Sequence, residues 1–298
     1  MVPDGKQYNI YAIIVTYNGS MENIEQLINI LRQDNVCHII IDNGSESLTF
    51  SNNLHVLQQN SNLGIAEAQN IGVEYCIKNE ADIIVFFDQD SEIESGFVKN
   101  LVEPIIAGHT EISAPTYVDI CAGFAYPIIK VSPIGIVRKH YFKGNNEERF
   151  TTNAVISSGM AVKMDLFKKV GLFNKLLFID YVDTEWCLRC FSQGYTASVN
   201  PKLKMRHAIG NYSLNVGFFR VPVHSPMRRY YRIRNAFLLM RMKHIPILLI
   251  LKEISFFYIH QIIILFGVRK NIGEYLYYTF LGTYHGITNR SGILRVKK

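Results

Sequence analysis

Residues 82–91 read Asp-Ile-Ile-Val-Phe-Phe-Asp-Gln-Asp-Ser, and this stretch decides the fold. Its apolar part is too rich in β-branched and aromatic residues for a short helix, so it predicts a buried strand that stops at Asp88. Similar apolar runs at 10–15 and 37–41 precede it, each followed by an amphipathic stretch, at 21–31 and 65–77. This alternation predicts an α/β fold with a parallel sheet flanked by helices.

Polar side chains follow each of these predicted strands. Thr16 and Asn18 come after the first, Asp42 after the second, and Asp88 and Asp90 after the third. Because ligands of open α/β sheets bind beyond the carboxyl ends of the strands, we expect these residues to face one crevice. The two later aspartates would suit Mg²⁺ or Mn²⁺, and an N-cap of the next helix is an equally good interpretation of them.

Composition sets the class of protein. The chain has 298 residues, 48% of them hydrophobic, which is enough for one large core or two moderate ones and excludes a disordered protein. Five cysteines are an odd number for a disulfide framework, and the first residues lack the apolar core of a signal peptide. We therefore expect a cytoplasmic protein.

Charge is distributed unevenly along the chain. Residues 1–225 hold 18 basic and 23 acidic side chains, whereas residues 226–298 hold 13 basic and two acidic ones. The basic segment predicts an anionic partner, either nucleic acid or a membrane surface. We expect three regions: a ligand-binding half at 1–110, a catalytic half at 111–225, and a basic helical extension at 226–298.

The extension contains two apolar segments. In residues 245–268, Lys252, Glu253 and His260 fall within one 100° sector, which predicts an amphipathic helix lying at a headgroup layer. Residues 275–284 are rich in tyrosine and phenylalanine, which suit a membrane interface. Packing against the catalytic region or against a second subunit is the alternative.

The motifs together resemble the inverting GT-A glycosyltransferases of family 2, and more narrowly their rhamnosyltransferase-like branch. The resemblance spans most of residues 10–240. Its motifs are Val-Thr-Tyr-Asn at 15–18, Asp-Asn-Gly-Ser at 42–45, Asn-Leu-Gly-Ile-Ala at 62–66, Gln-Asn-Ile-Gly at 69–72, Phe-Asp-Gln-Asp-Ser at 87–91, Ser-Gly at 158–159, the acidic run 178–186, His207, and His-Ser-Pro at 224–226.

This resemblance implies a nucleotide-sugar site and a divalent metal, Mn²⁺ or Mg²⁺. Asp90 would be the direct metal ligand, with Asp88 beside it and His207 as the third protein ligand. Thr16 and Asp42 would contact the base and ribose. The other implied donor-binding residues are Asn18, Asn43, Asn70, Asp88, Gln89, Arg228 and Arg229, with Arg234 and Asn235 ordering the last segment; an interfacial role is the alternative for these basic residues.

By the same resemblance, Asp183 would be the base that deprotonates the acceptor hydroxyl. Asp180, Glu185 and Trp186 would bind the acceptor, and the first two carboxylates could also raise the proton affinity of the base. An acidic first turn of a helix is the plain structural alternative for this cluster.

The resemblance therefore implies an enzyme that transfers a sugar with inversion to a hydroxyl of a lipid-linked saccharide in cell-surface polysaccharide synthesis. The implied donor is dTDP-L-rhamnose, with a UDP-hexose as the alternative. We expect peripheral attachment to the inner face of the cell membrane, with a homodimer as the alternative, and no nucleic-acid partner. The rival interpretations are a nucleotidyltransferase and a basic nucleic-acid-binding module.

Overall fold

The computed structural model describes residues 7–119, 125–142, 148–207, 212–216, 219–267 and 271–294. At residues 119, 207, 212–216 and 219–223 it describes the backbone alone. The side chain of the predicted metal ligand His207 is therefore outside the described part of the protein.

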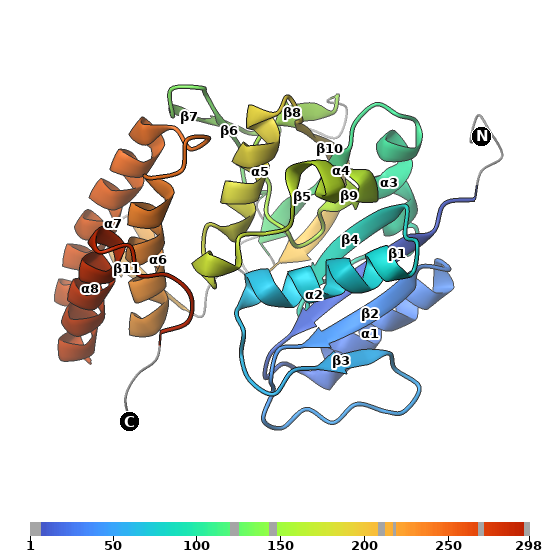
Figure 1. Cartoon of the computed structure of the whole chain (residues 1–298), viewed down its shortest axis with the longest axis horizontal. Coiled ribbons are helices and arrows are strands. Elements are labelled where there is room, and N and C mark those ends of the chain that lie inside the picture. The colour runs from blue at the N-terminus through green and yellow to red at the C-terminus, as the bar shows by residue number, and fades with distance from the viewer. Residues whose placement is uncertain are drawn as a thin grey trace.

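One eight-stranded mixed sheet forms the centre of the protein (Figure 1). Its first four strands are parallel to one another, and β9 runs antiparallel to both of its neighbours. The strand order is β3 (Val56–Gln58), β2 (Cys37–Asp42), β1 (Ile10–Thr16), β4 (Ile83–Asp88), β9 (Ala161–Lys163), β5 (Ile112–Asp119), β10 (Ala197–His207) and β8 (Phe150–Thr152). The strands expected at 10–15, 37–41 and 82–87 are confirmed.

Helices cover both faces of this sheet, because neighbouring side chains on a strand point to opposite faces. Ile13 belongs to one buried core and Ile14 to the other. The core of Ile14 includes side chains of α1 (Met21–Gln33) and α3 (Phe97–Ile106), whereas the core of Ile13 includes those of α2 (Ile65–Lys78), α4 (Met164–Val170) and α5 (Val182–Ser192). A short 3₁₀ helix, η1 (Lys175–Leu177), precedes α5.

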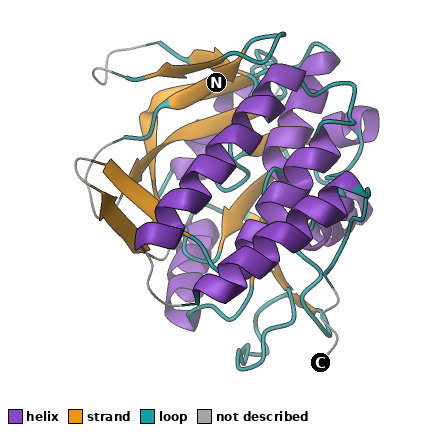
Figure 2. Ribbon diagram, turned by 90° about the vertical axis from the view of Figure 1, so that its left-hand side faces the viewer, coloured by secondary structure: helices purple, strands orange, loops and turns teal. Residues whose placement is uncertain are grey.

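Three further helices form a layer beside the sheet domain (Figures 1 and 2). They are α6 (Pro226–Leu239), α7 (Ile247–Gly267) and α8 (Ile272–Ile287). A Cβ on Gly282 would lie 2.7 Å from the Tyr230 carbonyl, and one on Gly286 would lie 2.7 Å from Phe237. These glycines therefore allow α8 to pack closely on α6. Two hairpins complete the fold, β6 (Ile128–Val131) with β7 (Val137–His140), and β11 (Tyr212–Val216) with β12 (Phe219–Val223).

Candidate active site

A cavity of about 720 Å³ opens beyond the carboxyl ends of β1 and β4. The parallel register explains its position: Thr16 lies opposite Asp42, and Val15 lies opposite Asp88, so the polar strand ends reach one edge of the sheet. Segment 178–183 and the start of α6 close the other side. The predicted site residues that line the cavity are Thr16, Asn43, Asp88, Gln89, Asp90, Asp180, Asp183 and Arg228.

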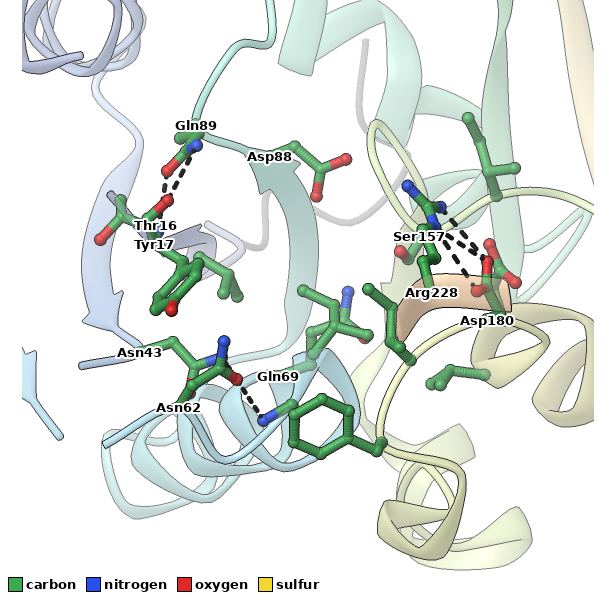
Figure 3. A pocket seen from close by; sticks show the side chains of 18 of the residues that line it. Thr16, Tyr17, Asn43, Asn62, Gln69, Asp88, Gln89, Ser157, Asp180 and Arg228 are labelled. Carbon is green, nitrogen blue, oxygen red and sulfur yellow. Dashed lines mark hydrogen bonds and ion pairs between the residues drawn. The ribbon is translucent and has the colours of Figure 1, made fainter. Parts of the chain in front are cut away.

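Asp88 and Asp90 occupy the turn that ends β4, and Asp88 points into the space between the two sides of the cavity (Figure 3). The backbone here is held by Ser158, whose buried hydroxyl accepts from the Asp88 N–H at 3.2 Å and contacts the Ser91 hydroxyl at 2.9 Å. Within the described part of the chain, no three His, Cys, Asp or Glu side chains form a metal-binding group. Two carboxylates still fit a divalent ion whose other ligands are oxygens of a bound diphosphate.

The side chain of Gln89 holds the loop after β1. Its Oε1 accepts from the Tyr17 N–H at 2.8 Å and its Nε2 donates to the Tyr17 carbonyl at 3.3 Å (Figure 3). A Cβ on Gly19 would lie 2.3 Å from the Gln89 Oε1, so a side chain at this position would displace the Gln89 amide. Gln89 thus lines the cavity, but both polar atoms of its side-chain amide bind the protein backbone.

Asn43 sits at the base of the cavity and joins two loops. Its Nδ2 donates to Asn62 at 3.2 Å, and its Oδ1 accepts from the Leu63 N–H at 2.9 Å. Both asparagines line the cavity. Their side chains therefore fix the entrance to α2 beside the ends of β1 and β2.

The other side of the cavity is a segment with unusual backbone geometry. Phe178, Asp180 and Tyr181 have φ values of 66°, 64° and 63°, in the left-handed region that non-glycine residues seldom adopt. Such conformations persist only where surrounding contacts hold them. The segment also packs tightly on α2, because a Cβ on Gly64 would lie 2.5 Å from the Phe178 carbonyl.

Two buried residues of α6 hold this segment. Asn235 Nδ2 donates to the carbonyls of Leu177 at 2.9 Å, Ile179 at 2.7 Å and Asp180 at 3.1 Å. Arg234 donates to the Leu177 carbonyl at 2.9 Å as well. The sequence interpretation, in which these two residues order segment 224–229, is wrong about the segment that they bind.

Asp183 lies in the first turn of α5 and lines the cavity. Burial raises the pKa of its carboxyl above the usual range, and the nearby Asp180 charge adds to the increase. Hydrogen bonds from backbone N–H groups, including that of Thr184 at 2.8 Å, oppose the increase. The result is a half-buried carboxylate that accepts a proton more readily than an exposed one.

Asp180 and Arg228 form an ion pair at the mouth of the cavity, with 3.2 Å between Oδ1 and Nη2 (Figure 3). His224 lines the cavity next to them. Burial, and then the Arg228 charge, lower the pKa of His224 to about 4, so the imidazole is neutral at neutral pH. A neutral imidazole and a partly exposed guanidinium can both donate hydrogen bonds to an anionic ligand.

The sequence matches glycosyl transferase family 2 over residues 11–171. It is also 40% identical over 290 residues, 95% of this chain and 97% of the other, to a Shigella flexneri protein named dTDP-rhamnosyl transferase RfbF. This chain belongs to glycosyl transferase family 2. It is a glycosyltransferase, and the family assignment replaces the nucleotidyltransferase and nucleic-acid-binding interpretations.

Solved structures agree on the GT-A fold of this glycosyltransferase. The crystal structure of GalNAc-T7 with UDP, GalNAc and Mn²⁺ superposes with a TM-score of 0.58 at 13% identity, over 96% of this chain and 59% of that chain. Staphylococcus aureus TarS 1–349 superposes with a TM-score of 0.56 at 15% identity, over 95% of this chain and 82% of that one. The predicted fold class is confirmed, although its sheet is mixed where the sequence suggested parallel strands.

Asp42 and Asn18 do not line the cavity of the glycosyltransferase. Asp42 is fully buried beneath it, where Oδ1 accepts from the Thr16 hydroxyl at 3.1 Å and from the Ser45 hydroxyl. Asn18 accepts from the Glu46 N–H at 3.0 Å. Both residues shape the loops around Thr16, and the prediction of direct donor contacts by them is not met by the structure.

Asn70 and Arg229 also lie away from the cavity. Asn70 is buried, donating to the Phe173 carbonyl at 3.0 Å and accepting from the Phe173 N–H at 2.9 Å. Arg229 is buried between α6 and α7, donating to Gln261 and to the Phe257 carbonyl. The prediction that they bind the donor is wrong, because their polar atoms are used to join elements of the protein.

The prediction that Glu185 and Trp186 bind the acceptor is also wrong, because both side chains are buried. Glu185 is 2% exposed and accepts from Arg189 at 2.9 Å and from His244 at 2.8 Å. Trp186 is fully buried, stacks on Phe167 and donates to the Gly171 carbonyl at 2.8 Å. Helical spacing explains the error: α5 turns Asp183 toward the cavity and the next acidic residue, two positions on, toward the core.

Gln69 is a cavity residue that the sequence interpretation did not include in the site. Its side chain is 2% exposed, and its Oε1 has no hydrogen-bond partner within the described part of the chain. A buried acceptor without a donor is destabilising unless a ligand provides one. The sequence feature that could have identified it is a polar residue, glutamine, at a position of α2 that faces the buried side of the helix.

Proposed function

We propose that this glycosyltransferase transfers a rhamnosyl group from dTDP-L-rhamnose, with inversion, to a hydroxyl of a lipid-linked saccharide in cell-surface polysaccharide synthesis. The relative at 40% identity, named a dTDP-rhamnosyl transferase, supports the donor. The observation that carries the proposal is the shared cavity, which is lined both by Asp88 and Asp90 at the end of β4 and by Asp183 at the start of α5. Inversion requires this arrangement, because the acceptor attacks from the face opposite the leaving group.

On the sheet side, Asp88 and Asp90 would hold a divalent ion, Mn²⁺ or Mg²⁺, against the donor diphosphate. The presence of Mn²⁺ with UDP in the GalNAc-T7 structure supports a metal in this fold. Such an ion would neutralise the negative charge that develops on the departing diphosphate. Arg228 and neutral His224 would add hydrogen bonds to the same charge from the loop side.

Gln69 supports a pyrimidine nucleotide. Its unpartnered Oε1 would accept the imide N–H of thymine or uracil, which supplies the missing donor. Both dTDP and UDP carry that group, so this contact selects the class of base and leaves the choice between the two donors to the sugar and the thymine methyl group.

On the loop side, Asp183 would accept the proton of the acceptor hydroxyl as the hydroxyl oxygen attacks the anomeric carbon. The raised pKa of this carboxyl favours proton transfer during attack. The Asp180–Arg228 pair borders the place where the hydroxyl must enter. Breaking that pair would free Asp180 to bind an acceptor hydroxyl while Arg228 contacts the diphosphate.

A donor panel tests the proposal. Thermal unfolding is measured with dTDP-L-rhamnose, UDP-glucose and UDP-GlcNAc, each with and without Mn²⁺. At 100 times Kd the true donor adds about 2.7 kcal/mol to the stability of the folded state, so dTDP-L-rhamnose should raise the Tm most, and only with the metal. A larger increase with a UDP-sugar would overturn the proposed donor. A product whose anomeric configuration is the same as that of the donor would overturn the inverting mechanism.

A further inference from the structure

The helix α7 is apolar on the side that packs against the protein, through Leu249, Ile250, Phe257 and Ile264, and it is apolar on its exposed side as well. Polar residues of α7 lie on both sides: Glu253 accepts from the Tyr181 hydroxyl at 3.0 Å and from Arg232 at 3.4 Å, and Gln261 is buried against Arg229, whereas Lys252 and Ser255 are exposed. The prediction of an amphipathic helix with one polar sector is therefore wrong, because apolar residues lie on both sides of α7. Glu253 and His260 point toward α6, and only Lys252 of the predicted polar sector is exposed.

The outward side of α8 continues the exposed apolar side of α7. The two helices lie together, with Tyr258 and Thr283 hydroxyls 2.7 Å apart. Phe266 of α7 is 87% exposed and Phe280 of α8 is 74% exposed. We name as the outer apolar face Leu248, Leu251, Ile259, Ile262 and Phe266 of α7 with Leu276, Tyr277, Phe280, Tyr284 and Ile287 of α8, all of them exposed.

Basic side chains accompany this face. Arg241 and Lys243 precede α7, Lys252 lies on its exposed side and Arg290 follows α8. All four are exposed, whereas Glu274 is the exposed acidic residue of the described part of segment 226–294. A large apolar face with basic neighbours requires an occupant that is both apolar and anionic.

We propose that the outer apolar face docks on the surface of an anionic lipid bilayer. The inner side of α7 is already bound to α6 and to the 178–183 segment, so the exposed apolar side is the one available for lipid. Lys252 lies 5.6 Å from the Phe256 ring and is placed to extend its ammonium to the headgroups while its alkyl chain stays with apolar neighbours.

Charge favours the bilayer over a second copy of the chain. A two-fold dimer would place this face against itself, so Arg241, Lys243, Lys252 and Arg290 would meet like charges. Anionic headgroups would pair with every one of them, at about a fivefold gain in binding for each basic side chain near the surface. The bilayer is therefore the better match for the same residues.

Docking is proposed at the surface, although α7 is long and apolar enough to cross a membrane by length and composition. Crossing would carry Glu253, His260 and Gln261 into hydrocarbon and would break their contacts with Tyr181 and Arg229. Surface docking keeps these contacts, and it fits the position of α7 and α8 on the outside of the helical layer (Figure 2).

Docking also places the cavity near the lipid. Tyr181 lines the cavity and binds Glu253 of α7 directly, so the loop side with Asp183 lies next to the docked helices. This consequence rests on the proposed function, because it concerns a lipid-linked acceptor. A carrier lipid in the same bilayer would present its saccharide on this side while the soluble donor enters from the sheet side.

Flotation of the full chain with vesicles tests the proposal. The protein should bind vesicles of equal parts phosphatidylglycerol and phosphatidylcholine, bind pure phosphatidylcholine at least tenfold less, and dissociate as salt is raised. The double variant Ile259→Gln/Phe280→Gln should lower binding roughly tenfold or more. Lys252→Gln/Lys243→Gln should lower it about 25-fold on anionic vesicles alone.

The control is Ile77→Gln, which alters an exposed apolar residue of α2 and should bind vesicles as the unaltered chain does. Circular dichroism and donor-induced thermal shifts should be the same for all variants, since every altered side chain is exposed. Vesicle binding that the outer-face variants leave unchanged would overturn the proposal. So would retention after alkaline carbonate extraction, which indicates a span, or a concentration-dependent dimer that these variants disrupt while no vesicle binds.

The readouts separate this proposal from the proposed function. If vesicle binding follows the outer apolar face but no rhamnosyl transfer occurs, the donor or reaction is wrong and the docking surface stands. If the protein glycosylates a soluble saccharide acceptor normally but does not bind vesicles, the proposed function stands and the docking surface is wrong.

Discussion

The two sides of the cavity are built by different means. On the sheet side, Thr16 and Asp88 end neighbouring parallel strands with ordinary strand geometry, and the buried Ser158 hydroxyl holds the 88–91 turn through the Asp88 N–H and the Ser91 hydroxyl. On the loop side, three residues between 178 and 181 have left-handed backbone conformations that local sequence does not favour. Asn235, more than fifty residues later, binds three of their neighbouring carbonyls.

This difference teaches which perturbations each side should resist. The sheet side depends on the same hydrogen bonds that form the core, so it is preformed wherever the domain is folded. The loop side depends on one interface between α6 and a strained segment. Changes on the sheet side should therefore act on donor binding, and changes on the loop side should act on turnover while donor binding persists.

The strongest test of this division is Asp183→Asn. The amide keeps the shape of the side chain but cannot take the acceptor proton, so we expect kcat to fall by roughly 10² to 10⁴-fold. The donor affinity measured by calorimetry should stay unchanged, because the proposed role of Asp183 involves the acceptor hydroxyl and not the donor. A donor affinity that falls as much as kcat does would contradict the assignment of donor binding to the sheet side and of turnover to the loop side.

On the sheet side, Asp90→Ala should show the opposite pattern. Loss of one carboxylate should weaken Mn²⁺-dependent donor binding by roughly 10 to 100-fold, since hydrogen bonds and contacts to charged groups contribute about 1.5–3 kcal/mol. Calorimetry with and without Mn²⁺ measures the effect. The matched control is Glu92→Ala, two residues beyond and outside the cavity lining, which should bind donor normally; an Asp90 variant that does the same would remove Asp90 as a ligand.

The sequence predicted the sheet side better than the loop side, and the reason is physical. Strand periodicity and the parallel register place Thr16 and Asp88 together without knowledge of any distant contact. The helix spacing of α5 could also have separated Asp183 from Glu185, because the two lie about 200° apart on a helix. Reading the acidic run as one cluster overlooked that rotation.

Other errors arose where tertiary packing decides the role of a polar residue. Asn70 and Arg229 look like ligand contacts by type, but each satisfies buried backbone or amide groups of the protein. The orientation of α7 is the same problem on a larger scale. The sequence placed Glu253 and His260 on an exposed side, and only the packing against α6 shows that these two side chains are turned inward among buried apolar residues.

Asn235→Ala probes the brace of the loop side. Three carbonyls would lose a buried donor, so we expect the free energy of unfolding to fall by about 1–3 kcal/mol. The kcat should fall about tenfold while donor Kd stays within twofold, because only the loop side is displaced. Denaturant unfolding and steady-state kinetics measure both effects.

The matched control for Asn235→Ala is Asn79→Ala. It removes an exposed hydrogen bond, 2.8 Å long, from the Asn79 side-chain amide to the Tyr75 carbonyl at the C-terminal end of α2. It should change neither quantity appreciably. An Asn235 variant with lowered stability and a normal kcat would show that the brace supports the fold without positioning Asp183.

The smallest expected effect is a change in the pH dependence of stability. The raised pKa of Asp183 means that the folded state holds this proton more tightly than the unfolded chain does. Stability from this group is therefore present at acid pH and is lost as pH rises from the ordinary aspartate range through the raised value. Asp183→Asn should unfold at a higher Tm than the unaltered protein at neutral pH, and the difference should shrink on acidification.

Asp90→Asn, measured in parallel, gives the reference for the sheet side. A Tm difference for Asp183→Asn that is independent of pH would show that burial of this carboxylate carries no penalty, and the loop side would then lack the proton affinity that its proposed role requires.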